Sequence, residues 1–224
     1  MDWSGEWWVL ILGPGLVILV VGILYFTRSR AFRFRSAAAQ LGFIALQGLR
    51  PISDEEKKGL NLFSRGMDAK ITNLFGDRVN SPSRLLFDFA DSVGPSRPAS
   101  AMTNQTVAAF RTTTDGIPDF RMTPARSIAE LPSSASPQQI SVDSHSDFGR
   151  RYTLRGENET AIRAFFNLPF VDRLTTADPE ANWSIEKAAG WLLVYRHNVL
   201  FPPQAIPESW QTAQGIADLF LERH

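Results

Sequence analysis

The segment from Asp143 to Asp147 contains the residue types best suited to chemistry, two carboxylates and an imidazole at alternate positions. In an extended chain, alternate side chains lie on one face, so Asp143, His145 and Asp147 would face the same way. Such oxygen and nitrogen ligands bind zinc and other divalent ions. Metal sites usually take further ligands from other segments, and only His197 and His224 remain as histidines. We therefore expect no bound metal and treat the three residues as candidate ligands, with a polar strand face or loop as the alternative.

Other catalytic patterns are absent from the sequence or unspecific. No Gly-x-Ser-x-Gly elbow, phosphate-binding loop or Gly-x-Gly-x-x-Gly turn occurs. Cysteine is absent, which excludes disulfides, thiolate nucleophiles and cysteine metal sites. Asp88 and Asp91 are a candidate acid and base pair, with solvated carboxylates at a strand edge as the alternative. The sequence thus favours a protein that is not an enzyme and has no cofactor, with an enzyme of unrecognised type as an alternative.

The densest basic cluster beyond the N-terminal region consists of Arg150, Arg151, Arg155 and Arg163. Guanidinium groups recognise phosphates and carboxylates, so the cluster is a candidate site for a phosphorylated ligand, a lipid headgroup or an acidic partner. The alternative is pairing with the acidic neighbours Asp147, Glu157 and Glu159. Over the whole chain 23 basic residues balance 23 acidic ones, which argues against nucleic acid as a partner.

The N-terminal region predicts a membrane anchor. Residues 7–26 contain no charge over twenty positions, and at about 1.5 Å per residue a helix of this length spans the roughly 30 Å of a bilayer's hydrocarbon core. Aromatic residues, which favour the headgroup levels, flank both ends: Trp3, Trp7, Trp8, Tyr25 and Phe26. We expect residues 1–27 to form a single transmembrane helix.

A break interrupts this predicted span at Gly13, Pro14 and Gly15. Proline removes a backbone donor and kinks a helix. Gly15 and Gly22 lie seven positions apart, on nearly one face, where small residues allow a second helix to approach closely. The break therefore predicts packing against other membrane subunits, with small residues of no particular role as the alternative.

The charges around the span predict its orientation. Asp2 and Glu6 precede it, and four arginines follow it: Arg28, Arg30, Arg33 and Arg35. Positive flanks stay in the cytoplasm, so the N-terminus is expected outside and the rest of the chain inside, at a bacterial inner membrane. A cleaved signal peptide, the alternative, begins with a basic region instead. The arginines, alternating with Phe32 and Phe34, are expected to contact anionic lipid.

The remaining chain predicts an α+β domain. Residues 28–42 form a basic helix with an apolar stripe, ended by Gly42, and residues 43–224 form the cytoplasmic domain, as one unit rather than two halves meeting near residues 131–138. Helices are expected from Ser53 to about Arg65, after the N-cap Asn158 and from Pro207. Strands are expected at 70–75, 84–90, 105–112, 119–122, 151–155, 182–186 and 191–196. Hairpin connections between them indicate an antiparallel sheet with flanking helices.

Several short runs carry a resemblance: Asn73–Gly76, Leu86–Phe89, Gln105–Phe110, Pro118–Phe120, Pro124, and Phe148–Gly156 with Glu159. Over nearly its whole length the chain resembles a group of uncharacterised bacterial single-span membrane proteins. The resemblance implies an N-terminal span with a basic flank and a cytosolic α+β domain. It implies no activity and no active-site residues.

These features favour a non-enzymatic accessory or scaffolding subunit of a membrane complex, in contact with lipids and other membrane proteins. Photosynthetic and respiratory complexes are the hosts that this topology suggests by analogy. Two alternatives remain: a membrane-tethered module that senses a ligand or lipid through the arginine cluster, and an enzyme of unrecognised type.

Overall fold

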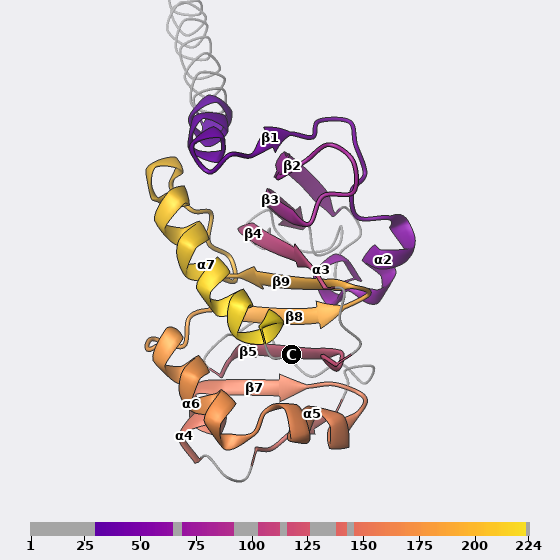
Figure 1. The fold of residues 1–224 in the computed structure, drawn as a ribbon, viewed down its shortest axis with the longest axis vertical. Coiled ribbons are helices and arrows are strands. Elements are labelled where there is room, and N and C mark those ends of the chain that lie inside the picture. Colours follow the sequence, from indigo (N-terminus) through magenta and orange to yellow (C-terminus); the bar gives the residue numbers. More distant parts are fainter. Residues whose placement is uncertain are drawn as a thin grey trace, which may run out of the picture.

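A computed structural model describes residues 30–64, 69–91, 103–112, 116–125, 138–142 and 146–222 (Figure 1). Several predicted features lie outside these ranges: Trp3, Trp7, Trp8, Gly13, Pro14, Gly15, Gly22, Tyr25, Phe26, Arg28, Asp143 and His145. Within the described ranges, none of the helices is long and apolar enough to cross a bilayer.

The described chain is an α+β domain with one antiparallel sheet and flanking helices, which confirms the fold class predicted for it. In chain order its elements are a helix over residues 30–40, β1 (Ile44–Ala45), α2 (Asp54–Gly59), α3 (Asn61–Ser64), β2 (Lys70–Gly76), β3 (Arg84–Asp91), β4 (Thr103–Arg111), β5 (Phe120–Pro124), β6 (Gln139–Ile140), α4 (Ser146–Arg151), β7 (Tyr152–Arg155), α5 (Glu159–Phe165), α6 (Leu168–Ala177), β8 (Ser184–Ala188), β9 (Trp191–Tyr195), a 3-10 turn (Pro203–Ala205) and α7 (Ile206–Leu221).

The sheet pairs strands from the early part of the chain with strands from its late part. Its nine strands lie in the order β1-β2-β3-β4-β9-β8-β5-β7-β6, and every neighbouring pair is antiparallel. The late strand β9 therefore pairs with β4, opposing Val107 with Tyr195 and Arg111 with Trp191. The hairpin of β8 and β9 consequently connects the meander β1–β4 to the strands β5–β7.

Helices cover both faces of the sheet because side chains alternate between its faces. On one face, helix 30–40, α7 and α4–α6 pack over a cluster that includes Leu86, Phe120 and Leu192. Figure 1 shows α7 crossing the central strands on this side. On the other face, Leu60 and Leu62 of the α2–α3 region join a second cluster with Phe87.

Helix 30–40 belongs to the first core. Phe34, Ala37 and Ala38 are 0%, 6% and 0% exposed, and the helix ends before Gly42, whose φ of 78° suits glycine. The predicted stripe and stop are therefore confirmed. Phe34 was expected at the lipid interface, but it stacks on Phe75 at 5.5 Å between ring centroids. Its position one turn before Ala38 places it on the buried side of the helix.

The helix predicted from Ser53 starts with the expected cap but ends early. Ser53 accepts a hydrogen bond from the Glu56 N–H, and the Glu56 carboxylate accepts one from the Ser53 N–H, which makes a capping box. The helix stops at Gly59, before the extended Leu60, and a separate helix, α3, begins at Asn61. The physical reason lies in the sheet, because the buried carboxylate of Glu186 accepts the N–H groups at this second start.

The hairpin of β8 and β9 closes more tightly than its sequence predicted. The expected turn covered residues 187–190, whereas strand pairing extends to Ala188 and Trp191 and leaves a two-residue connection. Ala189 and Gly190 have φ values of 50° and 75°. Two consecutive positive φ angles are typical of the type I′ turn, which matches the twist of the paired strands.

The last third of the chain contains both confirmed and unpredicted elements. Asn158 caps α5 through a hydrogen bond from the Ala161 N–H, as expected, and the predicted apolar stripe of α7 is buried. The helices α4 and α6 and the short strand β6 were not predicted. Because α4 begins at Ser146, an extended conformation does not continue to Asp147, which lies exposed in the first turn of a helix.

The packing of the aromatic side chains under α7 can be tested by mutation. Phe220 is 0% exposed, stacks on Phe120 at 5.4 Å and meets Phe170 edge-on at 4.9 Å. We expect Phe220→Ala to lower the free energy of unfolding by about 3–5 kcal/mol, since it leaves a cavity among these rings. The measurement is a urea titration of the full chain in detergent. Phe32→Ala is the matched control, because Phe32 is 75% exposed, and should change stability by less than about 0.5 kcal/mol; equal effects would contradict the prediction.

Candidate functional site

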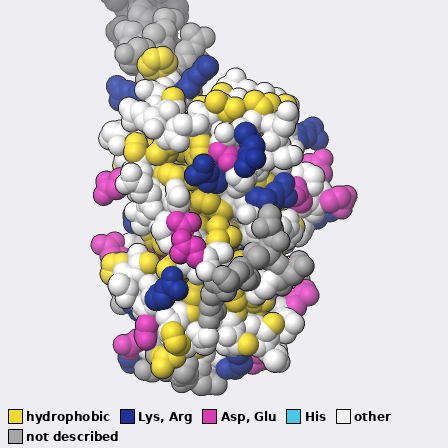
Figure 2. Space-filling model, in the orientation of Figure 1, with side chains coloured by type: hydrophobic (Ala, Val, Ile, Leu, Met, Phe, Trp, Pro, Cys, Tyr) yellow, Lys and Arg dark blue, Asp and Glu magenta, His cyan; other side chains and the backbone are white. Residues whose placement is uncertain are grey.

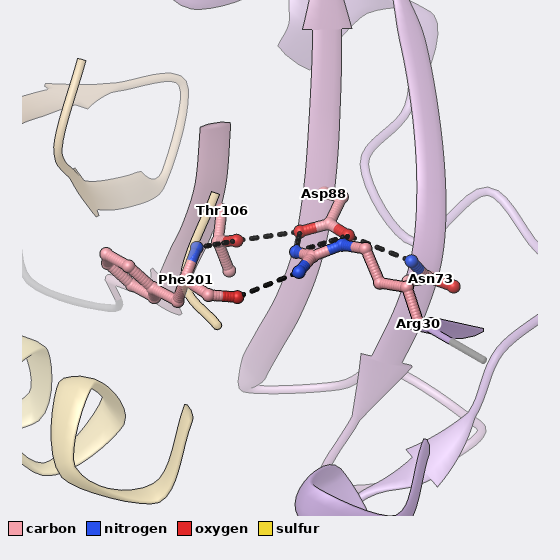
Figure 3. Close-up of polar contacts among 5 residues, drawn as sticks. All are labelled: Arg30, Asn73, Asp88, Thr106 and Phe201. Carbon is pink, nitrogen blue, oxygen red and sulfur yellow. Dashed lines mark hydrogen bonds and ion pairs between the residues drawn. The ribbon is translucent and has the colours of Figure 1, made fainter. Parts of the chain in front are cut away.

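The candidate site is an ion pair between helix 30–40 and β3, which links segments that are far apart in the sequence (Figure 3). The Arg30 Nε and Nη2 groups donate to the Asp88 carboxylate at 3.0–3.2 Å, so both carboxylate oxygens are engaged. The Arg30 Nη1 group donates to the backbone carbonyl of Phe201 at 2.9 Å. One guanidinium therefore joins the first helix, the sheet and the loop that leads to α7.

Two further side chains complete the coordination of Asp88. Thr106 Oγ1, on β4 directly opposite, donates to Asp88 Oδ1 at 2.7 Å and accepts the Phe201 N–H at 3.0 Å. Asn73 Nδ2 donates to Asp88 Oδ2 at 2.8 Å. Asn73 lies in the irregularity where the register of β2 against β3 shifts, with a φ of 48° that asparagine tolerates better than most residues. The bulge thus brings an amide to the carboxylate.

This arrangement is suited to holding elements together rather than to transferring protons. Asp88 is 5% exposed, and its oxygens already accept bonds from three side chains. The proposed acid and base pair of Asp88 and Asp91 is wrong, because residues three apart in a strand lie on opposite faces. Asp88 faces helix 30–40, whereas Asp91 shares the face of Phe87 and Phe89.

The arginine cluster is engaged within the domain, largely as its alternative predicted. Arg163 Nε donates to Glu159 at 2.8 Å, in the expected i, i+4 pair, and exposed Arg150 pairs with Asp147. Arg151 Nη2 donates to the backbone carbonyl of Asp178 at 2.6 Å. Arg155 lies in β7, opposite Arg121 of β5 and Gln139 of β6. The four arginines are therefore distributed over α4, β7 and α5 and do not form one open cationic surface.

The remaining predicted site residues have simpler positions. Arg33 and Arg35 are exposed on helix 30–40, as a lipid-contacting role requires, whereas Arg30 is bound to Asp88. Of the candidate metal ligands only Asp147 is described, and it pairs with Arg150. Across the described residues, no three His, Asp or Glu side chains are grouped closely enough to hold a metal ion.

A second buried carboxylate, Glu186 of β8, binds helix α3 on the opposite face of the sheet. It is 2% exposed and accepts the backbone N–H groups of Asn61 and Leu62. Burial raises the pKa of Glu186 to about 7, against the lowering effects of these donors and of the Arg121 charge. No local sequence pattern indicates this role, because Glu186 lies in an ordinary-looking amphipathic strand and its donors lie 124 and 125 residues away.

A cavity of about 820 Å³ opens beside β2, between the loop before α2 and the helices α2 and α3. Its walls include the apolar Ile52, Phe63 and Ile71. Three cations line it, Arg50, Lys57 and Lys58, and each is paired with Asp54 or Glu55. The described structure thus offers a cavity with a partly neutralised rim, to which Asp54 contributes a carboxylate.

Sequence analysis did not find the Arg30 network. Asp88 lies on the face opposite Leu85, Phe87 and Phe89, and the available sequence signal is a single acid between two aromatic residues of an apolar strand. Its partner lies 58 residues earlier in the chain, and Arg30 was assigned to lipid because it follows the predicted span. Only the folded arrangement pairs the two.

A double-mutant cycle should measure how strongly the network holds. The side chains of Arg30 and Asp88 are 22% and 7% exposed, and removing one partner leaves the other charge buried. We expect Arg30→Gln and Asp88→Asn to show a coupling energy of about 2 kcal/mol or more in urea titrations of the full chain. The same cycle on Arg150 and Asp147, 73% and 77% exposed, should give less than about 1 kcal/mol. Similar coupling in both cycles would show that the buried network contributes nothing special.

The raised pKa of Glu186 predicts a pH-dependent stability. Its pKa lies above the ordinary value of 4.5, so the folded state binds this proton more tightly than the unfolded chain does. The resulting stabilisation is complete below pH 4.5 and is lost as the pH rises through about 7. Between roughly pH 5 and pH 8 the free energy of unfolding should fall by up to about 3 kcal/mol through this group. Glu186→Gln should flatten that part of the profile, and Glu55→Gln, at an exposed glutamate, should retain it; parallel profiles for all three proteins would refute the assignment.

Comparison with known proteins places the fold but not the family. No protein-family model matches the chain, and no curated protein is similar to it in sequence. Among solved structures, the crystal structure of the mycobacterial trehalose monomycolate transport factor A, TtfA, is similar with a TM-score of 0.55 and 16% sequence identity. The match covers 86% of this chain and 95% of that one. At this identity the likeness establishes a shared fold over most of both chains.

Proposed function

We propose that this protein is a non-enzymatic accessory or scaffolding subunit of a membrane complex that transports an envelope component. One observation carries the proposal: the helix that follows the predicted span is built into the core of the domain. Phe34 and Ala38 are fully buried, and Arg30 is bound to Asp88 and Phe201. A domain joined in this way is held firmly to the helix that follows the span, which suits a scaffold better than a flexible tether does.

The short distance along the chain strengthens the argument. Only residues 27–29 separate the predicted span, which ends at Phe26, from the described helix. Three residues extend at most about 11 Å. If residues 7–26 cross the bilayer, the domain lies against the membrane surface, and its sheet is presented to partners at a constant height.

The likeness to TtfA supports a transport setting. That protein is named as a transport factor for trehalose monomycolate, a glycolipid, and its fold covers most of this chain. Together with the break at Gly13, Pro14 and Gly15, which favours packing against other helices, this makes a transport complex a better host than the photosynthetic or respiratory complexes suggested by topology. The resemblance to bacterial single-span proteins is consistent with the same assignment.

The proposed location follows from the charges around the span. Four arginines follow it and two acids precede it, so we place the N-terminus outside and the domain on the cytoplasmic side of the inner membrane. Proposed partners are membrane lipids and other membrane proteins. Ligand sensing through Arg150, Arg151, Arg155 and Arg163 is less favoured, because three of these arginines are bound to groups of the same domain.

The test is purification of the tagged full chain from its own membranes in mild detergent, followed by mass spectrometry of the proteins that co-migrate. We expect a stoichiometric membrane complex. Gly15→Leu combined with Gly22→Leu should reduce recovery of the partners several-fold, because bulky side chains prevent close helix contact.

The matched control is Gly215→Leu, at an exposed glycine with open space around its Cβ position, far from the predicted span in sequence. It should leave partner recovery unchanged. A monomeric chain that co-migrates with no membrane protein in any detergent would overturn the proposed function.

A further inference from the structure

Exposed hydrophobic side chains lie on helix 30–40 and on the loop before α7. Phe32 is 75% exposed, and Val199 and Leu200 are each 38% exposed. The loop is bound next to the start of this helix, because the carbonyl of Phe201 accepts a hydrogen bond from Arg30. Two segments about 170 residues apart thus bring apolar side chains to one end of the domain.

The loop is held rigidly although its side chains are exposed. The carbonyl of Val199 accepts the N–H of Thr106 at 2.9 Å, and the N–H of Phe201 donates to the Thr106 hydroxyl. Asn198 has a φ of 56°, and its N–H donates to the Gln105 side chain at 3.0 Å. Because the backbone is fixed on both sides of Val199 and Leu200, their exposure is a property of the folded domain.

The charged side chains of these two segments are of one sign. Helix 30–40 contains three arginines and no acid, and residues 196–206 contain Arg196 and again no acid. Arg33 and Arg35 are exposed. Figure 2 shows cationic and hydrophobic side chains side by side at the upper end of the molecule, where helix 30–40 begins. Apolar side chains flanked by arginines suit the headgroup region of an anionic bilayer.

We propose that the loop 198–201, with Val199 and Leu200, is a second membrane-contacting element, which lies on the lipid surface beside Phe32. The occupant is a lipid surface rather than a protein, because only residues 27–29 separate the predicted span from helix 30–40 and a hydrogen bond from Arg30 to the Phe201 carbonyl binds the loop to that helix. The inference rests on the membrane anchoring in the proposed function and is independent of any partner protein.

Two contacts with the bilayer, the span and the loop 198–201, restrict the rotation of the domain. A single helix leaves a domain free to rotate about the span, whereas a second contact removes that freedom. The hydrogen bond from Arg30 to the Phe201 carbonyl then keeps the loop beside helix 30–40, and the sheet is held at one tilt to the bilayer.

The experiment uses the absence of cysteine from the chain. Leu200→Cys and Phe32→Cys are each labelled with an environment-sensitive fluorophore in the full chain, which is reconstituted into phosphatidylcholine vesicles with added phosphatidylglycerol. Leu168→Cys is the matched control, because Leu168 is 46% exposed at the start of α6, at the other end of the sheet from helix 30–40 (Figure 1). Vesicles with brominated acyl chains report contact with lipid by quenching.

We expect labels at positions 200 and 32 to shift their emission to shorter wavelength and to lose most of their intensity in brominated vesicles, while the label at 168 retains both. Omitting phosphatidylglycerol should weaken the effect at 200. A chain that floats with the vesicles but gives equal emission at 200 and 168 would overturn this inference and leave the anchor intact. A chain that does not float would overturn the inference together with the anchor.

Discussion

The ion pair between Arg30 and Asp88 is the constraint on which the architecture depends. Arg30 of the first described helix binds Asp88, a buried acid at the centre of the β1–β4 meander. Neither charge is stable at such a site alone, because an unpaired charge in a protein interior costs several kcal/mol. The pair is therefore formed only when helix, sheet and the loop at Phe201 are assembled together. This couples the N-terminal helix to the loop that leads to the last helix.

On the other face of the sheet, a buried carboxylate likewise binds a helix. Glu186 binds the start of α3 through the N–H groups of Asn61 and Leu62, and Arg111 and Trp191 bind the Glu56 side chain of α2. Both faces thus carry an acid that orients short helices by hydrogen bonds, while the apolar clusters supply most of the burial. Hydrophobic contact alone would permit small shifts of these helices, whereas directional bonds to carboxylates select one arrangement.

The packing of helix 30–40 into the domain gives the proposed function its physical basis. The bound guanidinium, the buried Phe34 and the fixed loop 198–201 would transmit the position of the bilayer to the sheet. Scaffolds that align partners at a membrane need such fixed geometry, and enzymes tethered to a membrane do not.

The sequence by itself determined the periodic features: the uncharged stretch of residues 7–26, the stripe and stop of helix 30–40, the cap at Ser53, the alternation in β3 and the final helix. Each depends on neighbours a few positions away, so local chemistry is sufficient. The short elements α4, α6 and β6 escaped prediction because their formation depends on packing more than on pattern. Only the tertiary structure decided that Arg30 binds Asp88 rather than lipid, that Glu186 divides the predicted helix after Ser53, and that the arginine cluster is distributed over three elements. These outcomes rest on partners up to 171 residues apart, and no local pattern records which distant groups the fold will bring into contact.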